Sequence, residues 1–180
     1  MDGVEPGTVV ARRYRVVDEL ARGGMGVVYR VEHVHTGELL ALKVLIGAAN
    51  SDPQAIARFK REARASTQIR SEHVVRVSDA DTAVELGGNP FLVMELLKGV
   101  DLEQYIVRHG ALSPEHLVLV MSQVGRVLET AHSLGIVHRD LKPENLFLHE
   151  REDGKRIAKV LDFGISKFVS AEHALETAGV

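Results

Sequence analysis

Three short β-strand patterns follow one another near the start of the chain, separated only by short connections. They cover residues 13–20, 27–34 and 39–45 and are rich in β-branched, aromatic and aliphatic residues. A glycine cluster at 21–26 and a polar turn at 35–38 separate them. Parallel neighbours need a crossover of about a dozen residues or more, usually a helix. The sequence therefore predicts an antiparallel meander rather than β-α-β units.

Helices and further strands are predicted after this meander. Asp52-Pro53 carries the N-cap and first-position signature of a helix that runs to about residue 68. Ser113-Pro114 repeats that signature before a stripe of seven apolar positions between 117 and 131. Additional strands are expected at 74–78, 91–95 and 159–161. The fold class predicted from these elements is α+β.

Composition excludes several classes of protein. Hydrophobic residues make up 45% and charged residues 26%, as in ordinary globular domains. The absence of cysteine excludes disulfides and thiolate metal sites. A net charge of −3, with both signs interleaved, gives no reason to expect nucleic acid as a partner. No secretory signal or membrane-length apolar run is present, so a cytoplasmic location is expected, with an anchor outside these residues left open.

The glycine cluster Gly23-Gly24-Met25-Gly26 has two interpretations. Backbone N–H groups of a strand–loop–strand unit can approach phosphate oxygens where no Cβ intervenes. Taken alone, however, the cluster is more simply explained as a hairpin turn.

Two charged residues lie within apolar patterns. Lys43 shares a strand face with Ala41 and Leu45, and a lysine on a buried face needs an anionic partner or ligand. Glu62 lies on the apolar side of the helix that begins near Pro53, where it could pair with Lys43. A solvated lysine and a solvated surface glutamate are the alternatives for each residue taken alone.

One segment decides between these interpretations. His138-Arg139-Asp140-Leu141-Lys142-Pro143-Glu144-Asn145 is followed, 17 residues after Asn145, by Asp162-Phe163-Gly164. With the glycine loop, Lys43 and Glu62, the chain resembles the protein kinase superfamily, whose motifs occur here in the same order. The form Lys142-Pro143-Glu144 resembles serine/threonine kinases, and the sequences around the glycine loop and Asp162 resemble bacterial kinases of the eukaryotic type.

The resemblance implies a kinase-like architecture. Residues 10–97 would form an ATP-binding N-lobe with a five-stranded antiparallel sheet and one main helix. Residues 98–180 would form the first part of a mainly helical C-lobe. No A-P-E segment follows Asp162-Phe163-Gly164. We therefore expect a C-terminally truncated kinase domain that is weakly active or inactive alone, with an apolar patch exposed along 117–131.

Site roles follow from the same resemblance. Asp140 would orient the substrate hydroxyl and accept its proton, and Lys142 would neutralise the γ-phosphate. Lys43 would hold the α- and β-phosphates and be steadied by Glu62. The metal ligands for Mg²⁺ would be Asn145 and Asp162. The residues expected to contact ATP are Leu20, Gly23, Gly24, Gly26, Val28, Ala41, Lys43, Met94, Glu95, Leu97 and Phe147.

The implied activity is transfer of the ATP γ-phosphate to Ser or Thr hydroxyls of protein substrates. Ala21 replaces the first glycine of the family's loop, for which a modest loss of nucleotide affinity is expected. A non-catalytic nucleotide-binding module and a kinase-like small-molecule phosphotransferase are the alternatives. The Lys142-Pro143-Glu144 and Asp162-Phe163-Gly164 forms disfavour the phosphotransferase.

Overall fold

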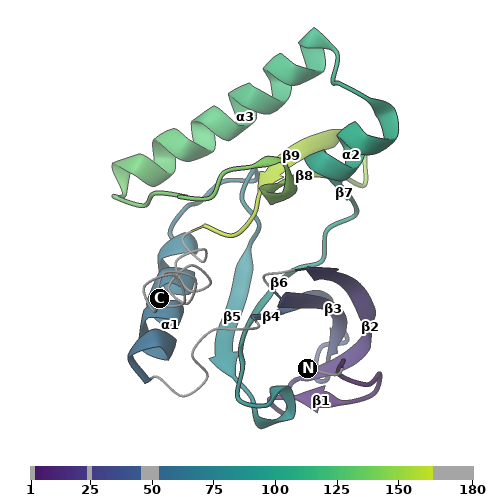
Figure 1. The fold of residues 1–180 in the computed structure, drawn as a ribbon, viewed down its shortest axis with the longest axis vertical. Coiled ribbons are helices and arrows are strands. Elements are labelled where there is room, and N and C mark those ends of the chain that lie inside the picture. The colour runs from purple at the N-terminus through teal and green to yellow at the C-terminus, as the bar shows by residue number, and fades with distance from the viewer. Residues whose placement is uncertain (1–2, 24–25, 46–52, 164–180) are drawn as a thin grey trace, which may run out of the picture. The chain divides into compact units, whose positions relative to one another are not determined.

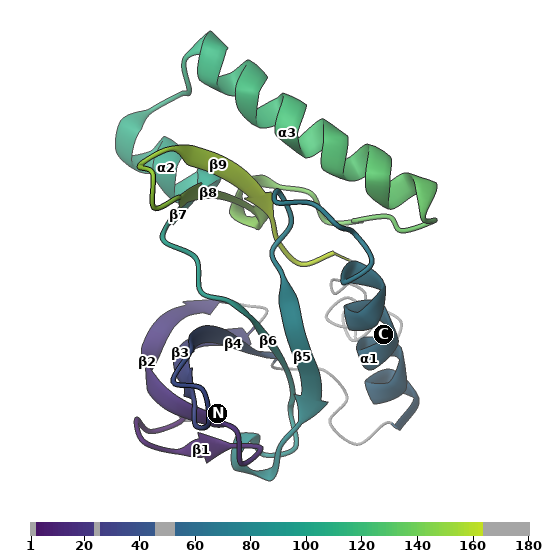
Figure 2. The same ribbon diagram turned by 180° about the vertical axis from the view of Figure 1, so that it is seen from behind.

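The computed structural model describes residues 3–23, 26–45 and 53–163. Within them the chain forms two compact units (Figures 1 and 2). The first contains the residues up to Arg64 together with Arg76–Leu96, and the second contains Ala65–Val75 and the residues from Leu97 onward. Each unit has its own hydrophobic core. The α+β fold class predicted from the sequence is thus present as two separately packed parts.

A curved antiparallel sheet of six strands forms the first unit (Figure 1). Its spatial order is β1-β2-β3-β4-β6-β5. The strands are β1 (Val9–Val10), β2 (Tyr14–Gly23), β3 (Gly26–His33), β4 (Leu39–Leu45), β5 (Val77–Thr82) and β6 (Pro90–Glu95), with a short 3-10 helix η1 (Val84–Leu86) before β6. The meander predicted from the first three strand patterns is confirmed as β2-β3-β4.

The predicted count of five strands was one too low. The additional strand, β1, has two residues and pairs with β2 through Val10↔Tyr14. The chain reverses between them at Ala11 and Arg12, which have positive φ angles of 48° and 58°. Neither residue is a glycine, so the turn carries no sequence signal. Val10 is nonetheless fully buried, and it closes one end of the core.

Helix α1 (Pro53–Ser66) is the one described helix that packs in the first unit. It begins at the predicted proline and ends two residues before the expected end. Phe59 and Ala63, one helical turn apart, are both 1% exposed. The strand expected at 74–78 is shifted, because Val74 forms an isolated parallel bridge with Val160 and β5 begins only at Val77.

The second unit combines a three-stranded sheet with two α-helices (Figure 2). The elements are β7 (Gly99–Asp101), α2 (Leu102–His109), α3 (Pro114–Ser133), a 3-10 helix η2 (Pro143–Asn145), β8 (Leu146–Glu150) and β9 (Arg156–Val160). The predicted cap is confirmed, since the Ser113 hydroxyl accepts the His116 N–H at 3.3 Å and Pro114 opens α3. The helix therefore starts where the sequence placed it.

Helix α3 has an apolar surface wider than its buried face. Val120, Val124, Val127 and Ala131 are buried in the core of the second unit. Exposed apolar side chains lie along the same helix at Leu117, Val118, Leu119 and Met121. Exposed apolar residues are therefore present on α3, but only over 117–121, whereas the later positions of the predicted stripe are buried or half-buried. No helix in the described part of the chain has the length and apolar character needed to cross a membrane.

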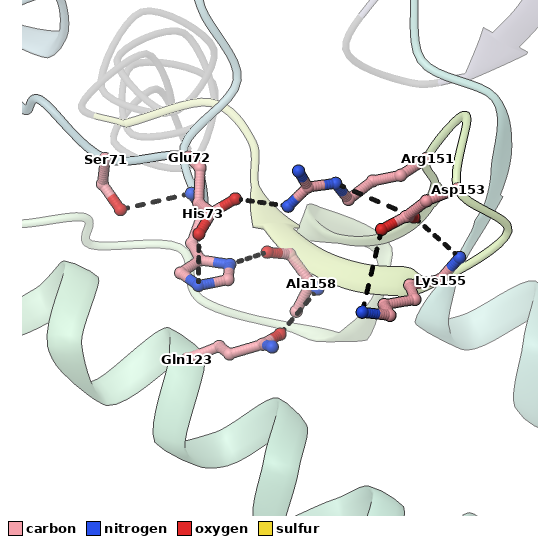
Figure 3. Close-up of polar contacts among 8 residues, drawn as sticks. All are labelled: Ser71, Glu72, His73, Gln123, Arg151, Asp153, Lys155 and Ala158. Carbon is pink, nitrogen blue, oxygen red and sulfur yellow. Dashed lines mark hydrogen bonds and ion pairs between the residues drawn. The ribbon is translucent and has the colours of Figure 1, made fainter.

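The segment that follows α1 belongs to the second unit, and polar contacts hold it there (Figure 3). His73 Nδ1 donates to the carbonyl oxygen of Ala158 at 3.0 Å, and the Ala158 N–H donates to Gln123 Oε1 at 2.8 Å. Glu72 pairs with Arg151 at 2.8 Å. These contacts join residues 71–73 to β9 and to the β8–β9 turn, and β9 in turn to α3. They explain why this segment packs apart from the rest of the α1 region.

Candidate active site

One face of the six-stranded sheet gathers four of the residues predicted to contact ATP. Lys43 on β4 lies directly opposite Val28 on β3, and Ala41 lies opposite Met94 on β6. Because directly opposed residues share a sheet face and alternate residues of a strand do so too, all four side chains project from the same side. Ala41 and Met94 are buried, and Lys43 is half-buried. A lysine thus shares this face of the sheet with three apolar residues.

The glycine loop is closed by the pair Gly23↔Gly26 at the ends of β2 and β3. Gly24 lies outside the described residues. Gly26 has a φ of 142°, and a Cβ there would collide with the carbonyl oxygen of Val44. Gly23 has no atom near the position of such a Cβ. The fold therefore requires glycine at 26, whatever the loop binds.

We expect Gly26→Ala to lower the free energy of unfolding by at least about 1 kcal/mol, because the backbone conformation and the Val44 carbonyl both oppose a side chain. Gly23→Ala is the matched control and should change stability little. Urea denaturation followed by circular dichroism would measure both. Equal stability of the two variants would contradict the close approach of Gly26 to β4.

The remaining predicted residues of the ATP-binding half lie in different surroundings. Leu20 on β2 is 45% exposed. Glu95 ends β6, where its carboxylate accepts the Arg76 N–H at 2.8 Å. Leu97 is the first residue of the longer segment of the second unit. Glu62 belongs to α1, but its side chain lies outside the described residues, so its pairing with Lys43 stays a prediction.

The predicted catalytic residues of the second unit form one cluster. The amide nitrogen of Asn145 donates to the Asp140 carbonyl oxygen at 2.7 Å and to its carboxylate at 3.1 Å. Lys142 Nζ lies 3.6 Å from Asp140 Oδ2. Asn145 is only 5% exposed, whereas the Asp140 side chain is 27% exposed. A buried amide thus orients a carboxylate that remains partly exposed to solvent.

His138 joins this loop to the segment that carries Asp162. The Asp140 N–H donates to His138 Nδ1 at 3.3 Å, so the ring proton lies on Nε2, which donates to the Leu161 carbonyl at 2.6 Å. The Leu161 N–H in turn donates to the Asn145 carbonyl at 2.9 Å. The ring of Phe163 meets that of His138 edge-on, with centroids 4.7 Å apart. The two motifs are therefore adjacent, as the sequence predicted.

Backbone strain marks the same two segments. Arg139 and Asp162 have positive φ angles of 70° and 57°, which residues other than glycine seldom adopt. Such conformations cost about 1–3 kcal/mol each and persist where surrounding contacts enforce them. Here the contacts of His138 and Leu161 supply that enforcement. This strain carries no signal in the amino-acid sequence.

The donors in this cluster suit a hard divalent cation. Because the Asn145 amide nitrogen binds Asp140, its carbonyl oxygen is the atom suited to a metal. Asp162 supplies a carboxylate on the adjoining segment. Mg²⁺ commonly uses one or two protein oxygens together with substrate phosphates.

Phe147, the remaining residue predicted to contact ATP, is half-buried on β8 and lies opposite Lys159 of β9.

Comparison with known proteins agrees with this geometry. Residues 14–179 match the protein kinase domain family. Serine/threonine-protein kinase Pkn1 of Myxococcus xanthus is 42% identical over 93% of this chain and 23% of its own length. Serine/threonine-protein kinase PknA of Mycobacterium tuberculosis is 36% identical over 97% of this chain and 40% of its own length.

Solved structures give the same result. A crystal structure of the Mycobacterium tuberculosis PknI kinase domain, a double mutant, aligns with a TM-score of 0.78 and 30% identity, covering 91% of this chain and 62% of that one. The chain spans well under half the length of the two curated kinases above, at 23% and 40%. The chain belongs to the protein kinase domain family.

Proposed function

We propose that this chain carries the ATP-binding and catalytic-loop parts of a serine/threonine protein kinase, which transfers the γ-phosphate of ATP to protein hydroxyls. Residues 10–97 bind the nucleotide, and residues 98–180 supply the catalytic loop. The observation that carries the proposal is the Asp140–Lys142–Asn145 cluster, hydrogen-bonded to the segment that ends in Asp162 and Phe163. The names of the relatives support serine and threonine as acceptors.

In this proposal Asp140 is the residue that contacts the acceptor hydroxyl. Its carboxylate is held by Asn145, stays partly exposed and can accept a hydrogen bond from a serine or threonine. Lys142, 3.6 Å from Asp140, places a positive charge where the transferring phosphate gathers negative charge. The residues thus position and neutralise rather than form covalent intermediates.

The nucleotide is held mainly by the first unit. Val28, Ala41 and Met94 offer an apolar surface for the adenine. Phe147 is proposed as a further adenine contact. Lys43 lies on the same sheet face and binds the α- and β-phosphates, steadied by Glu62. Asn145 and Asp162 hold Mg²⁺, which when bound offsets the charge of the phosphates.

Asp162→Asn tests the metal site through binding alone. Loss of one charged ligand should reduce the Mg²⁺-dependent part of ATP affinity by about 10–100-fold or more. Thermal unfolding with ATP, with and without Mg²⁺, measures this, because ligands of the native state raise its melting temperature. Asp153→Asn, at a carboxylate 47% exposed in the β8–β9 turn, is the control and should behave like wild type. An unchanged Mg²⁺ response in Asp162→Asn would refute the assignment.

We further propose that the 180 residues alone transfer phosphate slowly. The catalytic loop follows α3, and that helix is packed on one flank while Leu117, Val118 and Met121 remain exposed. A catalytic constellation needs support behind it to hold its geometry. Slow transfer with intact nucleotide binding is the combination expected of such a scaffold.

A further inference from the structure

An ion-pair network links α1 to the sheet of the first unit. Lys60 Nζ on α1 lies 2.7 Å from Asp81 Oδ1 on β5, and Figure 1 shows the two elements side by side. The pair is only partly exposed, at 36% and 38% of the side chains. Neither residue belongs to the motifs that the sequence singled out. The pair joins a helix and a strand of the same unit, so it constrains the position of α1 on the sheet.

Asp81, the strand residue of this pair, also has contacts with residues other than Lys60. The Thr82 N–H donates to Asp81 Oδ1 at 2.9 Å, and Arg13 lies 3.6 Å from the other carboxylate oxygen. Arg13 also binds Asp79 at 2.8 Å, and the buried Tyr14 hydroxyl donates to that same aspartate at 2.8 Å. The hydrogen bond from Lys60 holds the pKa of Asp81 below its ordinary value. The Asp81 carboxylate therefore has contacts on the sheet side that do not depend on Lys60.

Helix geometry relates this contact to Glu62. Successive residues turn by about 100°, so Lys60 and Glu62 leave α1 on opposite flanks of the buried Phe59, about 100° to one side and about 60° to the other. Phe59 and Ala63 are both buried and lie on one face of α1. A contact at Lys60, on the flank of that face, adds a second constraint on the rotation of α1 about its axis and therefore on the backbone direction at position 62.

We propose that Asp81 is a positioning residue, which by holding Lys60 sets the rotation of α1 and presents Glu62 to Lys43. The inference rests on the proposed ATP site, because Glu62 matters only if Lys43 binds phosphate. Lys60 and Asp81 touch neither substrate nor metal in this scheme; they act through Glu62. If the pair only stabilised the surface, its removal would lower the free energy of unfolding. It would leave nucleotide affinity unchanged at temperatures well below the melting temperature.

The test is a double-mutant cycle on Mg²⁺·ATP affinity, measured by calorimetric titration of the full 180-residue chain. Lys60→Met and Asp81→Asn are each expected to weaken binding about 2–5-fold, the range of a partly exposed ion pair. Lys60→Arg, which keeps the charge, should restore affinity. In a Glu62→Gln background the Lys60→Met change should have no further effect, because its route of action is already removed.

Matched controls separate the possible failures. Arg15→Met removes a pair of similar exposure, Arg15–Glu32 at 2.9 Å between β2 and β3, and should leave ATP affinity unchanged. If wild type does not bind Mg²⁺·ATP, the proposed function itself fails. If wild type binds but Lys60→Met and Asp81→Asn bind equally well, the positioning role is wrong. Equal losses from Lys60→Met with and without Glu62→Gln would also overturn it. Asp81→Asn leaves the sequence of α1 intact, so a folding defect of the helix variant cannot decide the outcome.

Discussion

Asp140→Asn is expected to lower phosphoryl transfer by about 10²–10⁴-fold, the usual contribution of a positioned general base, while ATP affinity stays within about twofold of wild type. Asparagine keeps the shape of the side chain and can still contact Asn145, so the loop should remain folded. It cannot accept the proton of an attacking hydroxyl. The change therefore removes chemistry without removing the binding site.

A single-turnover assay with the chain in excess over γ-labelled ATP would measure this, because slow transfer still accumulates label. Phosphoamino-acid analysis should find the label on serine or threonine. Asp153→Asn, in the exposed β8–β9 turn, is the control and should match wild type. If wild type and Asp140→Asn acquire the same amount of label, or neither acquires any, Asp140 contributes nothing to transfer. The chain is then a nucleotide-binding module instead. Rapid wild-type transfer would contradict the proposed weakness of these 180 residues.

The parts of the fold that the sequence predicted depend on local signals. The cap and proline at Ser113-Pro114 and the proline at 53 fix where α3 and α1 begin, since capping and ring geometry act within one turn. Strand alternation likewise placed Lys43 and Ala41 on one sheet face, which the pairing of β4 confirms. These features need no knowledge of the distant chain.

The features that the sequence did not predict depend on contacts between distant segments. Strand β1 exists because Val10 completes the core beside Tyr14, while its turn uses two residues without turn signals. Val74 pairs with Val160, more than eighty residues away, rather than extending β5. Local propensity carries no information about such a partner. Strand boundaries there were accordingly wrong.

The candidate site shows the same division. The catalytic loop and the Asp162 motif could be predicted together, because each is recognisable as a contiguous run of residues. Lys60 and Asp81 could not, since an exposed lysine on a helix and an aspartate on a strand are ordinary surface residues until the fold places them 2.7 Å apart. Positive φ at Asp162 was equally unpredictable, because the surrounding contacts impose it.

Phe163→Ala should cost about 3–5 kcal/mol of unfolding free energy, the range for removing a buried phenyl ring. Phe163 is 2% exposed and lies in the core of the second unit with residues of α3 and β9. Its ring also meets His138 edge-on, a contact that contributes about 0.5–1.5 kcal/mol beyond burial. Removal of the phenyl ring therefore leaves a cavity, and His138 loses its packing partner.

The consequence reaches the catalytic loop because His138 contacts both that loop and the segment that precedes Asp162. Its ring accepts the Asp140 N–H and donates to Leu161, next to Asp162. A loosened ring should let Asp140 and Asp162 move independently, so Mg²⁺·ATP binding should weaken together with stability.

Phe163→Leu preserves most of the side-chain volume and should cost less than about 1.5 kcal/mol of unfolding free energy. The chain has no tryptophan, so urea denaturation is best followed by far-ultraviolet circular dichroism. Val118→Ala, at a side chain 69% exposed on α3, is the control, and a Phe163→Ala loss no larger than that control would show that the ring does not anchor the loop.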